Sequence, residues 1–252
     1  IYFLLFNYIL FSQENNYSLN FDGENDFIEI PNSNIFPFDN NDFSISFQIK
    51  FAENDTDGTI LDKMYYDSNN TKGIYIRQYG DEIQVALGGY GDFTYIYIGD
   101  YLNNEWLNFT LSCTWGEEAL IFINANVIET ISIADINVQS IENPIPLCIG
   151  NELFPNSFPF NGSLDNIQLW NFALSTEDIQ NYIDCIPSGT EDGLVAYWNF
   201  EEGSSEGQVI DVSGNGNNGI LFGGNYLEDV PEQICQNNNE ENNLTTLIGD
   251  LN

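Results

Sequence analysis

The sequence predicts an all-β protein, an antiparallel β-sandwich of two sheets, on two observations. Apolar and polar residues alternate with a period of two along most of the chain, and helical periodicity is scarce. The alternating segments recur about every 8–12 residues and are joined by turns rich in Gly, Asn and Asp. With 252 residues, 42% of them hydrophobic, the chain can bury one sizeable core.

The clearest strand is expected at residues 43–51, where Phe or Ile alternates with Ser, Gln or Lys. Further strands are expected at residues 83–88, 93–98 and 107–113, and the middle one of these is apolar on both faces. Residues 119–123 and 127–133 bracket Asn124-Ala125-Asn126, an arrangement that predicts a β-hairpin.

Residues 160–179 combine a turn, a strand and a short helix. Asn161-Gly162 predicts the turn, and apolar residues alternate through the strand that follows it. Ser175 is expected to cap the helix, because Glu177 and Asp178 would then lie at the positive end of the helix dipole.

This ordered pattern, F-x-G-x-[IL]-D-x-[IVL]-x-[IVL]-[WY]-x-x-x-L-S-x-x-[ED]-I, resembles the closing strand of laminin-G-like and pentraxin-like domains. Those domains belong to the concanavalin A-like lectin/glucanase superfamily. Earlier segments also resemble strands of these domains, at residues 19–30, 59–63, 120–128 and 147–150. The resemblance implies a two-sheet antiparallel jelly-roll β-sandwich with one short helix after the closing strand.

The expected organisation is a laminin-G-like β-sandwich over residues 17–184, flanked by segments of different amino-acid composition. Residues 1–12 contain an apolar run that predicts the remnant of a signal peptide, and a first buried strand is the alternative. Residues 236–252 are rich in Asn and Glu and predict a linker. A signal peptide in turn predicts a secreted or cell-surface location.

Residues 193–203 and 211–219 resemble a strand pair that normally precedes the opening strand of these domains. Here the pair follows the closing helix, so it either completes the sandwich as a permuted strand pair or begins a second domain. We favour permuted completion over residues 185–235, because the termini of a jelly roll lie close together. The oxygen-rich loop from Asp211 to Asn217 is, by the same resemblance, mainly a structural turn.

The four cysteines do not predict a zinc site, because the chain has no C-x-x-C spacing and no histidine. Two disulfides, or one disulfide with two buried thiols, both fit an exported protein. Cys185 and Cys235 flank the out-of-place segment, and we expect a disulfide between them to close it as a loop. Cys113 and Cys148 then form a second pair or remain two thiols.

The charge of the chain excludes some partners. A net charge of −35, from 39 acidic and 4 basic residues, disfavours nucleic acid and anionic membranes, which require clustered Lys or Arg. We therefore expect no nucleic-acid partner and no membrane insertion of the mature domain. The same surface would attract divalent cations, although an acidic coat of no specific function is the alternative.

The resemblance to pentraxin-like domains implies a calcium site between two loops. The matching positions carry carboxylate and amide oxygens, the ligands that Ca²⁺ prefers: Asp67, Asn69 and Asn70 in one loop, Asn151 and Glu152 in the other. The chain departs from pentraxins in continuing with Leu153 and Phe154, so we expect one Ca²⁺ at most. Ordinary polar turn residues are the alternative.

Aromatic side chains supply candidate ligand-binding residues, because sugar rings stack on flat apolar faces. We select Tyr65, Tyr66 and Tyr90, which lie in or beside the predicted loops. Tyr75, Arg77 and Tyr79 alternate on one strand face and would place a cation between two rings. Trp170 and Trp198 lie in predicted strands and are expected in the core.

No catalytic constellation is found, so we do not expect an enzyme. Glucanases of this superfamily carry an E-x-D-x-x-E run, and the corresponding stretch here has the single acid Asp165. The expected function is a secreted or cell-surface binding module for calcium-assisted recognition of a polysaccharide or glycan. The alternatives are an adhesive or structural module that binds an extracellular protein, and an accessory domain of a carbohydrate-active enzyme.

Overall fold

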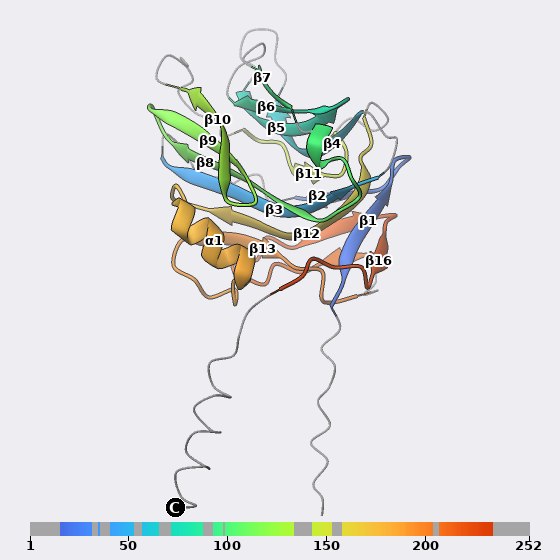
Figure 1. Ribbon diagram of the computed structural model, residues 1–252. Helices are drawn as coiled ribbons and strands as arrows, with labels where there is room; N and C mark the ends of the chain where they lie inside the picture. The colour runs from blue at the N-terminus through green and yellow to red at the C-terminus, as the bar shows by residue number, and fades with distance from the viewer. Residues whose placement is uncertain are drawn as a thin grey trace, which may run out of the picture.

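The computed structural model describes residues 16–31, 35, 41–52, 57–65, 72–87, 93–97, 99–133, 143–152, 158–203 and 207–233. Within these ranges the chain forms two facing antiparallel sheets, which confirms the predicted sandwich (Figure 1). A short 3₁₀ helix, Gly99–Tyr101, and one α-helix, Thr176–Asp184, complete the described elements.

Sheet A has the strand order β10-β9-β8-β3-β12-β1-β16, and β13 also pairs with β12. Its strands are β10 (Asn126–Ser132), β9 (Glu118–Ile123), β8 (Leu107–Thr114), β3 (Phe43–Phe51), β12 (Asn161–Trp170), β1 (Ser18–Asp22), β16 (Asn225–Leu227) and β13 (Leu194–Trp198). The predicted hairpin is β9–β10, and positive φ angles of 49° at Asn124 and 59° at Ala125 make its two-residue turn type I′.

Sheet B has the strand order β14-β15-β2-β11-β4-β5-β6-β7. Its strands are β14 (Gln208–Val209), β15 (Gly219–Phe222), β2 (Phe27–Ile30), β11 (Leu147–Ile149), β4 (Asp57–Tyr65), β5 (Lys72–Tyr79), β6 (Glu82–Leu87) and β7 (Phe93–Tyr97). Apolar residues from the inner faces of both sheets form one continuous core, as the period-two patterning requires.

The helix α1 follows β12 and covers part of the outer face of sheet A (Figure 1). It begins where predicted: Asp178 N–H donates to Ser175 Oγ, and the Asp178 carboxylate accepts from Ser175 N–H, a capping box. Both tryptophans are buried, but Trp198 joins the main core, whereas Trp170 packs under α1 against Tyr182.

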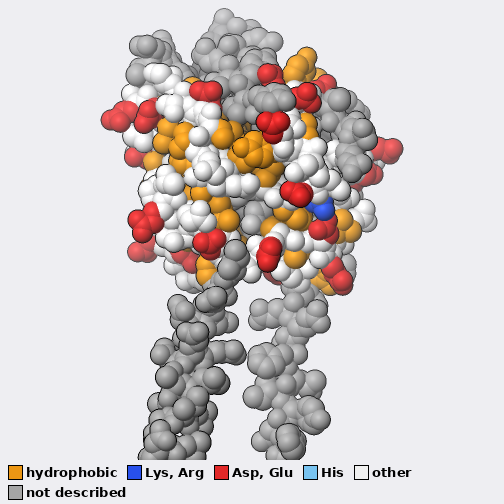
Figure 2. All heavy atoms as spheres, in the orientation of Figure 1, with side chains coloured by type: hydrophobic (Ala, Val, Ile, Leu, Met, Phe, Trp, Pro, Cys, Tyr) orange, Lys and Arg blue, Asp and Glu red, His pale blue; other side chains and the backbone are white. Residues whose placement is uncertain are grey.

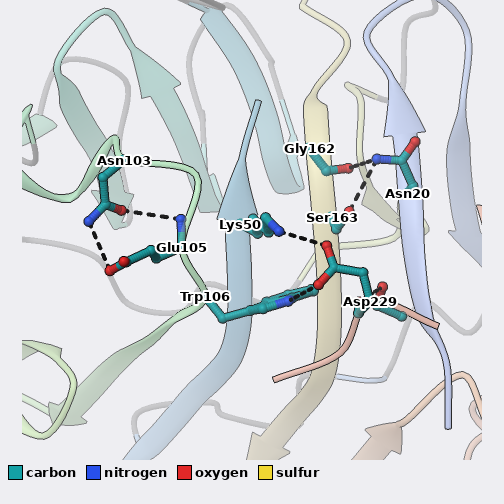
Figure 3. Close-up of polar contacts among 9 residues, drawn as sticks. Asn20, Lys50, Asn103, Glu105, Trp106, Gly162, Ser163 and Asp229 are labelled. Atoms are coloured by element: carbon teal, nitrogen blue, oxygen red, sulfur yellow. Dashed lines mark hydrogen bonds and ion pairs between the residues drawn. The ribbon is translucent and has the colours of Figure 1, made fainter. Parts of the chain in front are cut away.

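The segment after α1 contributes strands to both sheets. β13 pairs with β12 and β16 with β1 in sheet A, while β15 pairs with β2 in sheet B. The chain then returns to the start of β1, where Ser18 Oγ donates to the carbonyl of Asp229 at 2.7 Å. The Asp229 carboxylate accepts from Lys50 Nζ at 2.6 Å and from Trp106 Nε1 at 3.2 Å (Figure 3).

Cysteine pairing offers a first testable prediction. Cys113 and Cys148 are buried free thiols in β8 and β11, and burial raises the pKa of the Cys113 thiol to about 12. Cys235 lies outside the described residues, so its pairing with Cys185 stays a prediction. We expect no reactive thiol in the native protein, two after unfolding, and a Cys185–Cys235 peptide in a non-reducing digest.

The control for this experiment is the same digest after reduction, which must lose the cross-linked peptide. A peptide that joins Cys185 to Cys113 or to Cys148 would contradict the expected pairing.

Candidate functional site

The outer face of sheet B carries a group of polar and aromatic side chains around one arginine. Along β5, Ile74 and Ile76 point into the core, so the alternating residues Tyr75, Arg77 and Tyr79 share the outer face. The register pairs Arg77 with Gln84 of β6, which therefore lies on the same face.

Aromatic rings surround the guanidinium of Arg77. Its central carbon lies 5.7 Å from the centroid of the Tyr75 ring, 5.4 Å from that of Tyr79 and 4.4 Å from that of Phe158. All three separations are within the range of a cation–π interaction. The alternation of Tyr75, Arg77 and Tyr79 therefore places a cation between two aromatic rings, as the sequence predicted.

Polar contacts fix the orientation of the same guanidinium. Arg77 Nη2 donates to Gln84 Oε1 at 2.9 Å, and the Tyr75 hydroxyl donates to the same oxygen at 2.6 Å. Arg77 Nη1 lies 3.9 Å from Glu152 Oε1, an ion pair with side chains only 14% and 24% exposed. We call Tyr75, Arg77, Tyr79, Gln84, Glu152 and Phe158 the Arg77 cluster.

The Arg77 cluster runs from a buried to an exposed end. Tyr75 and Gln84 are buried, Arg77 and Glu152 are partly exposed, and Tyr79 is 47% exposed. A ligand approaching from the exposed end would meet an aromatic ring, guanidinium donors and a carboxylate acceptor. These groups are held in place before binding, so a ligand would find them preorganised.

The described half of the predicted calcium set does not fit a cation by itself. The side chain of Asn151 is buried and its Oδ1 accepts from Glu152 N–H at 2.8 Å, while the Glu152 carboxylate faces the guanidinium of Arg77. A positive charge beside the carboxylate disfavours a second cation there. Asp67, Asn69 and Asn70 lie outside the described residues. In the described ranges, no three His, Cys, Asp or Glu side chains form a group that could hold a metal ion.

The predicted ligand-binding tyrosines are not part of the Arg77 cluster as described. Tyr65 ends β4 opposite Lys72, and alternation places it on the face of sheet B that Ile74 occupies, away from Arg77. Tyr66 and Tyr90 lie outside the described residues. Gln84 and Phe158 were missed, because Gln84 reaches Arg77 only through the pairing of β5 with β6, and Phe158 is distant in sequence.

Acidic side chains outnumber basic ones on the surface, as the net charge of −35 requires. Figure 2 shows them scattered over the visible face, with few basic groups among them. Among the described helices, none has the length and apolar character needed to cross a bilayer.

Comparison with known proteins gives the following similarities. The family model described as "Concanavalin A-like lectin/glucanases superfamily", of the laminin-G type, matches residues 22–180. No curated protein sequence matches the chain.

Solved structures show the same fold. A candidate carbohydrate-binding protein from Bacteroides ovatus is 16% identical with a TM-score of 0.65, over 88% of this chain and 62% of that one. A heptameric SAP-like pentraxin from Limulus polyphemus is 16% identical with a TM-score of 0.50, over 68% and 83%. The receptor-binding domain of botulinum neurotoxin D is 17% identical with a TM-score of 0.51, over 65% and 42%. The chain thus spans less than two thirds of the length of the Bacteroides protein.

Proposed function

Because the chain belongs to the concanavalin A-like lectin/glucanase superfamily, we propose that it is a carbohydrate-binding module that recognises a polysaccharide or glycan through the Arg77 cluster. The superfamily also includes glucanases, so the fold alone does not decide between binding and hydrolysis. The Arg77 cluster contains a single carboxylate, that of Glu152, whereas retaining or inverting hydrolysis requires two carboxyl groups across the scissile bond. This composition favours binding.

The observation that supports the proposal is the fixed guanidinium of Arg77 between aromatic rings. A sugar presents an apolar ring face and a rim of hydroxyl groups, so its binding site needs a flat apolar surface beside paired donors and acceptors. Tyr79 supplies an exposed ring, Arg77 supplies donors, and Glu152 supplies an acceptor. The Bacteroides protein, which shares the fold and is described as a candidate carbohydrate-binding protein, supports the same class of ligand.

Calcium assistance and export stay predictions. Asn151 and Glu152 stay predicted calcium ligands, together with Asp67, Asn69 and Asn70, which lie outside the described residues. Because Arg77 already compensates the charge of Glu152, we expect glycan binding at the Arg77 cluster to persist in chelator. The secreted or cell-surface location was predicted from residues 1–12, which lie outside the described residues.

A second candidate function is suggested by an apolar strip at the other end of the outer face of sheet B. Phe27 and Phe222 stack with ring centroids 4.5 Å apart, and Ile220 and Phe222 are 44% and 42% exposed. Exposed apolar patches of this kind mark contact surfaces for other proteins. They favour the adhesive, protein-binding alternative.

A glycan array with matched variants separates the two candidates. Tyr79→Ala removes an exposed ring from the Arg77 cluster, and Phe222→Ala removes a similarly exposed ring from the apolar strip. We expect Tyr79→Ala to lower glycan affinity about tenfold or more, since a central aromatic contact contributes over about 1.4 kcal/mol. Phe222→Ala should bind glycans as the wild type does, with and without chelator.

Two results would contradict the proposal. One is the absence of signal for every glycan with wild-type protein. The other is a signal that Phe222→Ala abolishes and Tyr79→Ala leaves unchanged.

A further inference from the structure

A row of three side chains crosses β4, β5 and β6 at the exposed end of the Arg77 cluster. Strand pairing places Asp57 of β4 opposite Tyr79 of β5, and Tyr79 opposite Glu82 of β6. Residues directly opposite in paired strands share a face, and their Cβ atoms lie about 5 Å apart. Tyr79 is therefore flanked by a carboxylate on each side, on the outer face of sheet B.

Both carboxylates are accessible beside the Tyr79 ring. Asp57 and Glu82 are partly exposed, and Tyr79 is 47% exposed. Asp57 Oδ1 accepts from Gly80 N–H at 3.3 Å, a bond that orients this carboxylate at the end of the row. Within the described ranges, the two acids belong to no group of three His, Cys, Asp or Glu side chains that could hold a metal ion. The row therefore presents an aromatic ring between two separate negative charges.

The basic residues of β4, β5 and β6 do not balance these acids. Lys63 is opposite Ile74 and Lys72 is two residues before it, so both lie on the inner face with Ile74. Arg77 is the basic residue of these three strands on the outer face, and it is itself ion-paired with Glu152. The exposed end of the Arg77 cluster is therefore net negative, in a chain whose net charge is −35.

A ligand with positively charged groups fits this row. An ammonium group beside a tyrosine ring is attracted by the negative face of the ring, and the two carboxylates add Coulomb attraction. An anionic ligand is instead repelled by both carboxylates and by the negative field of the whole chain. The row thus selects ligands by charge.

The row behind Tyr79 favours a sugar as the carrier of the positive charge. Thr59 lies opposite Arg77 and is 1% exposed, and Thr59 Oγ1 and Arg77 Nε are both buried with no hydrogen-bond partner among the described residues. A hydroxyl group donates and accepts at once, so one hydroxyl between these two atoms would satisfy both. The ammonium of a lysine side chain only donates. A polyhydroxylated ligand therefore matches both rows, whereas a lysine-rich peptide matches the outer row alone.

We propose that the Arg77 cluster binds a glycan that carries protonated amino groups, namely a polymer of hexosamine without N-acetyl groups. This inference rests on the proposed function and adds to it the charge of the ligand. An amino group of the glycan lies against Tyr79 between Asp57 and Glu82, and a sugar hydroxyl bonds Arg77 and Thr59. The same arrangement disfavours polymers of uronic acids.

Three sugar hexamers of different charge test this inference: those of glucosamine, N-acetylglucosamine and galacturonic acid. At about pH 6 and low salt, calorimetry on the wild type should show the glucosamine hexamer binding about tenfold more tightly than the acetylated one, since a cation–π contact and an exposed ion pair together contribute about that much. The uronate hexamer should bind most weakly. The advantage of glucosamine should shrink in about 1 M salt, and at about pH 9, where an amine similar to an α-amino group has lost its proton.

Two matched double variants locate the effect. Asp57→Asn with Glu82→Gln should make the glucosamine and N-acetylglucosamine hexamers bind about equally, because the amides still accept hydrogen bonds but carry no charge. Glu117→Gln with Glu118→Gln removes the same charge from two exposed acids of sheet A, before and at the start of β9, and should keep the preference. Equal loss of the preference in both double variants would overturn the inference, because net charge would then decide it.

The remaining outcomes separate this inference from the proposed function. If the acetylated or the uronate hexamer binds at least as tightly as the glucosamine hexamer, and Tyr79→Ala abolishes that binding, the charge preference is wrong and the proposed function stands. Hexalysine that binds as tightly as the glucosamine hexamer would also overturn the inference, because the protein would then recognise charge without a sugar. Wild-type protein that binds no glycan would contradict both.

Discussion

Replacing Arg77 by alanine is expected to weaken glycan binding by about thirtyfold or more, because an arginine at the centre of a binding site typically contributes over about 2 kcal/mol to binding. The change removes the donors of the Arg77 cluster and leaves the carboxylate of Glu152 without its counter-charge. It also removes the group that Tyr75, Tyr79 and Phe158 enclose. Isothermal titration with a glycan that binds on the array measures the effect.

The conservative variant Arg77→Lys sharpens this test. Lysine keeps the positive charge but lacks the planar fork that donates to Gln84 while it is ion-paired with Glu152, so binding should still fall about tenfold. Lys50→Ala is the matched control. It also removes one ion-paired positive charge, but Lys50 pairs with Asp229 and does not belong to the Arg77 cluster. Equal loss of affinity in Lys50→Ala and Arg77→Ala would show that net charge, not the Arg77 cluster, controls binding.

Replacing Asp211 by alanine should lower the free energy of unfolding by about 3 kcal/mol, because buried donors lose their acceptor. Asp211 Oδ1 accepts from Tyr197 N–H and from the N–H and hydroxyl of Ser213, and Oδ2 accepts from Asn217 N–H. These bonds attach the loop after β14 to β13. Urea denaturation followed by tryptophan fluorescence measures the loss, which corresponds to about 6–12 °C in Tm.

The exposed neighbour Asp192 provides the control for this prediction. Asp192→Ala lies in the same segment and should change stability by less than about 0.5 kcal/mol. If Asp211→Ala changes the free energy of unfolding as little as Asp192→Ala does, the loop does not hold β13 in place. The oxygen-rich loop would then need another role.

Local sequence patterns predicted the features that depend on neighbours in sequence. The alternation in 43–51 became β3, and Ser175 with Asp178 became the capping box of α1. The hairpin at Asn124-Ala125 was also predicted, although its turn type required the φ angles of both residues. In each case the determining interactions lie within a few residues.

Features that depend on strand register were not predicted. Trp170 was expected in the core and is fully buried, but register decides which part of the core it joins: it packs under α1, on the face of β12 opposite to Leu169. Tyr65 was selected as a ligand-binding residue, but pairing of β4 with β5 places it away from Arg77. A one-residue shift in register exchanges the two faces of a strand. The pattern within one strand therefore does not predict which residues of neighbouring strands share a face.

Backbone amide exchange, measured with and without a glycan that binds the protein, tests the central claim most directly. If the Arg77 cluster is the recognition site, protection should increase in β5 and β6, over residues 72–79 and 82–87, and at Glu152, with sheet A unchanged. Protection confined to sheet A, or to β2 and β15 around Phe27 and Phe222, would contradict recognition by the Arg77 cluster.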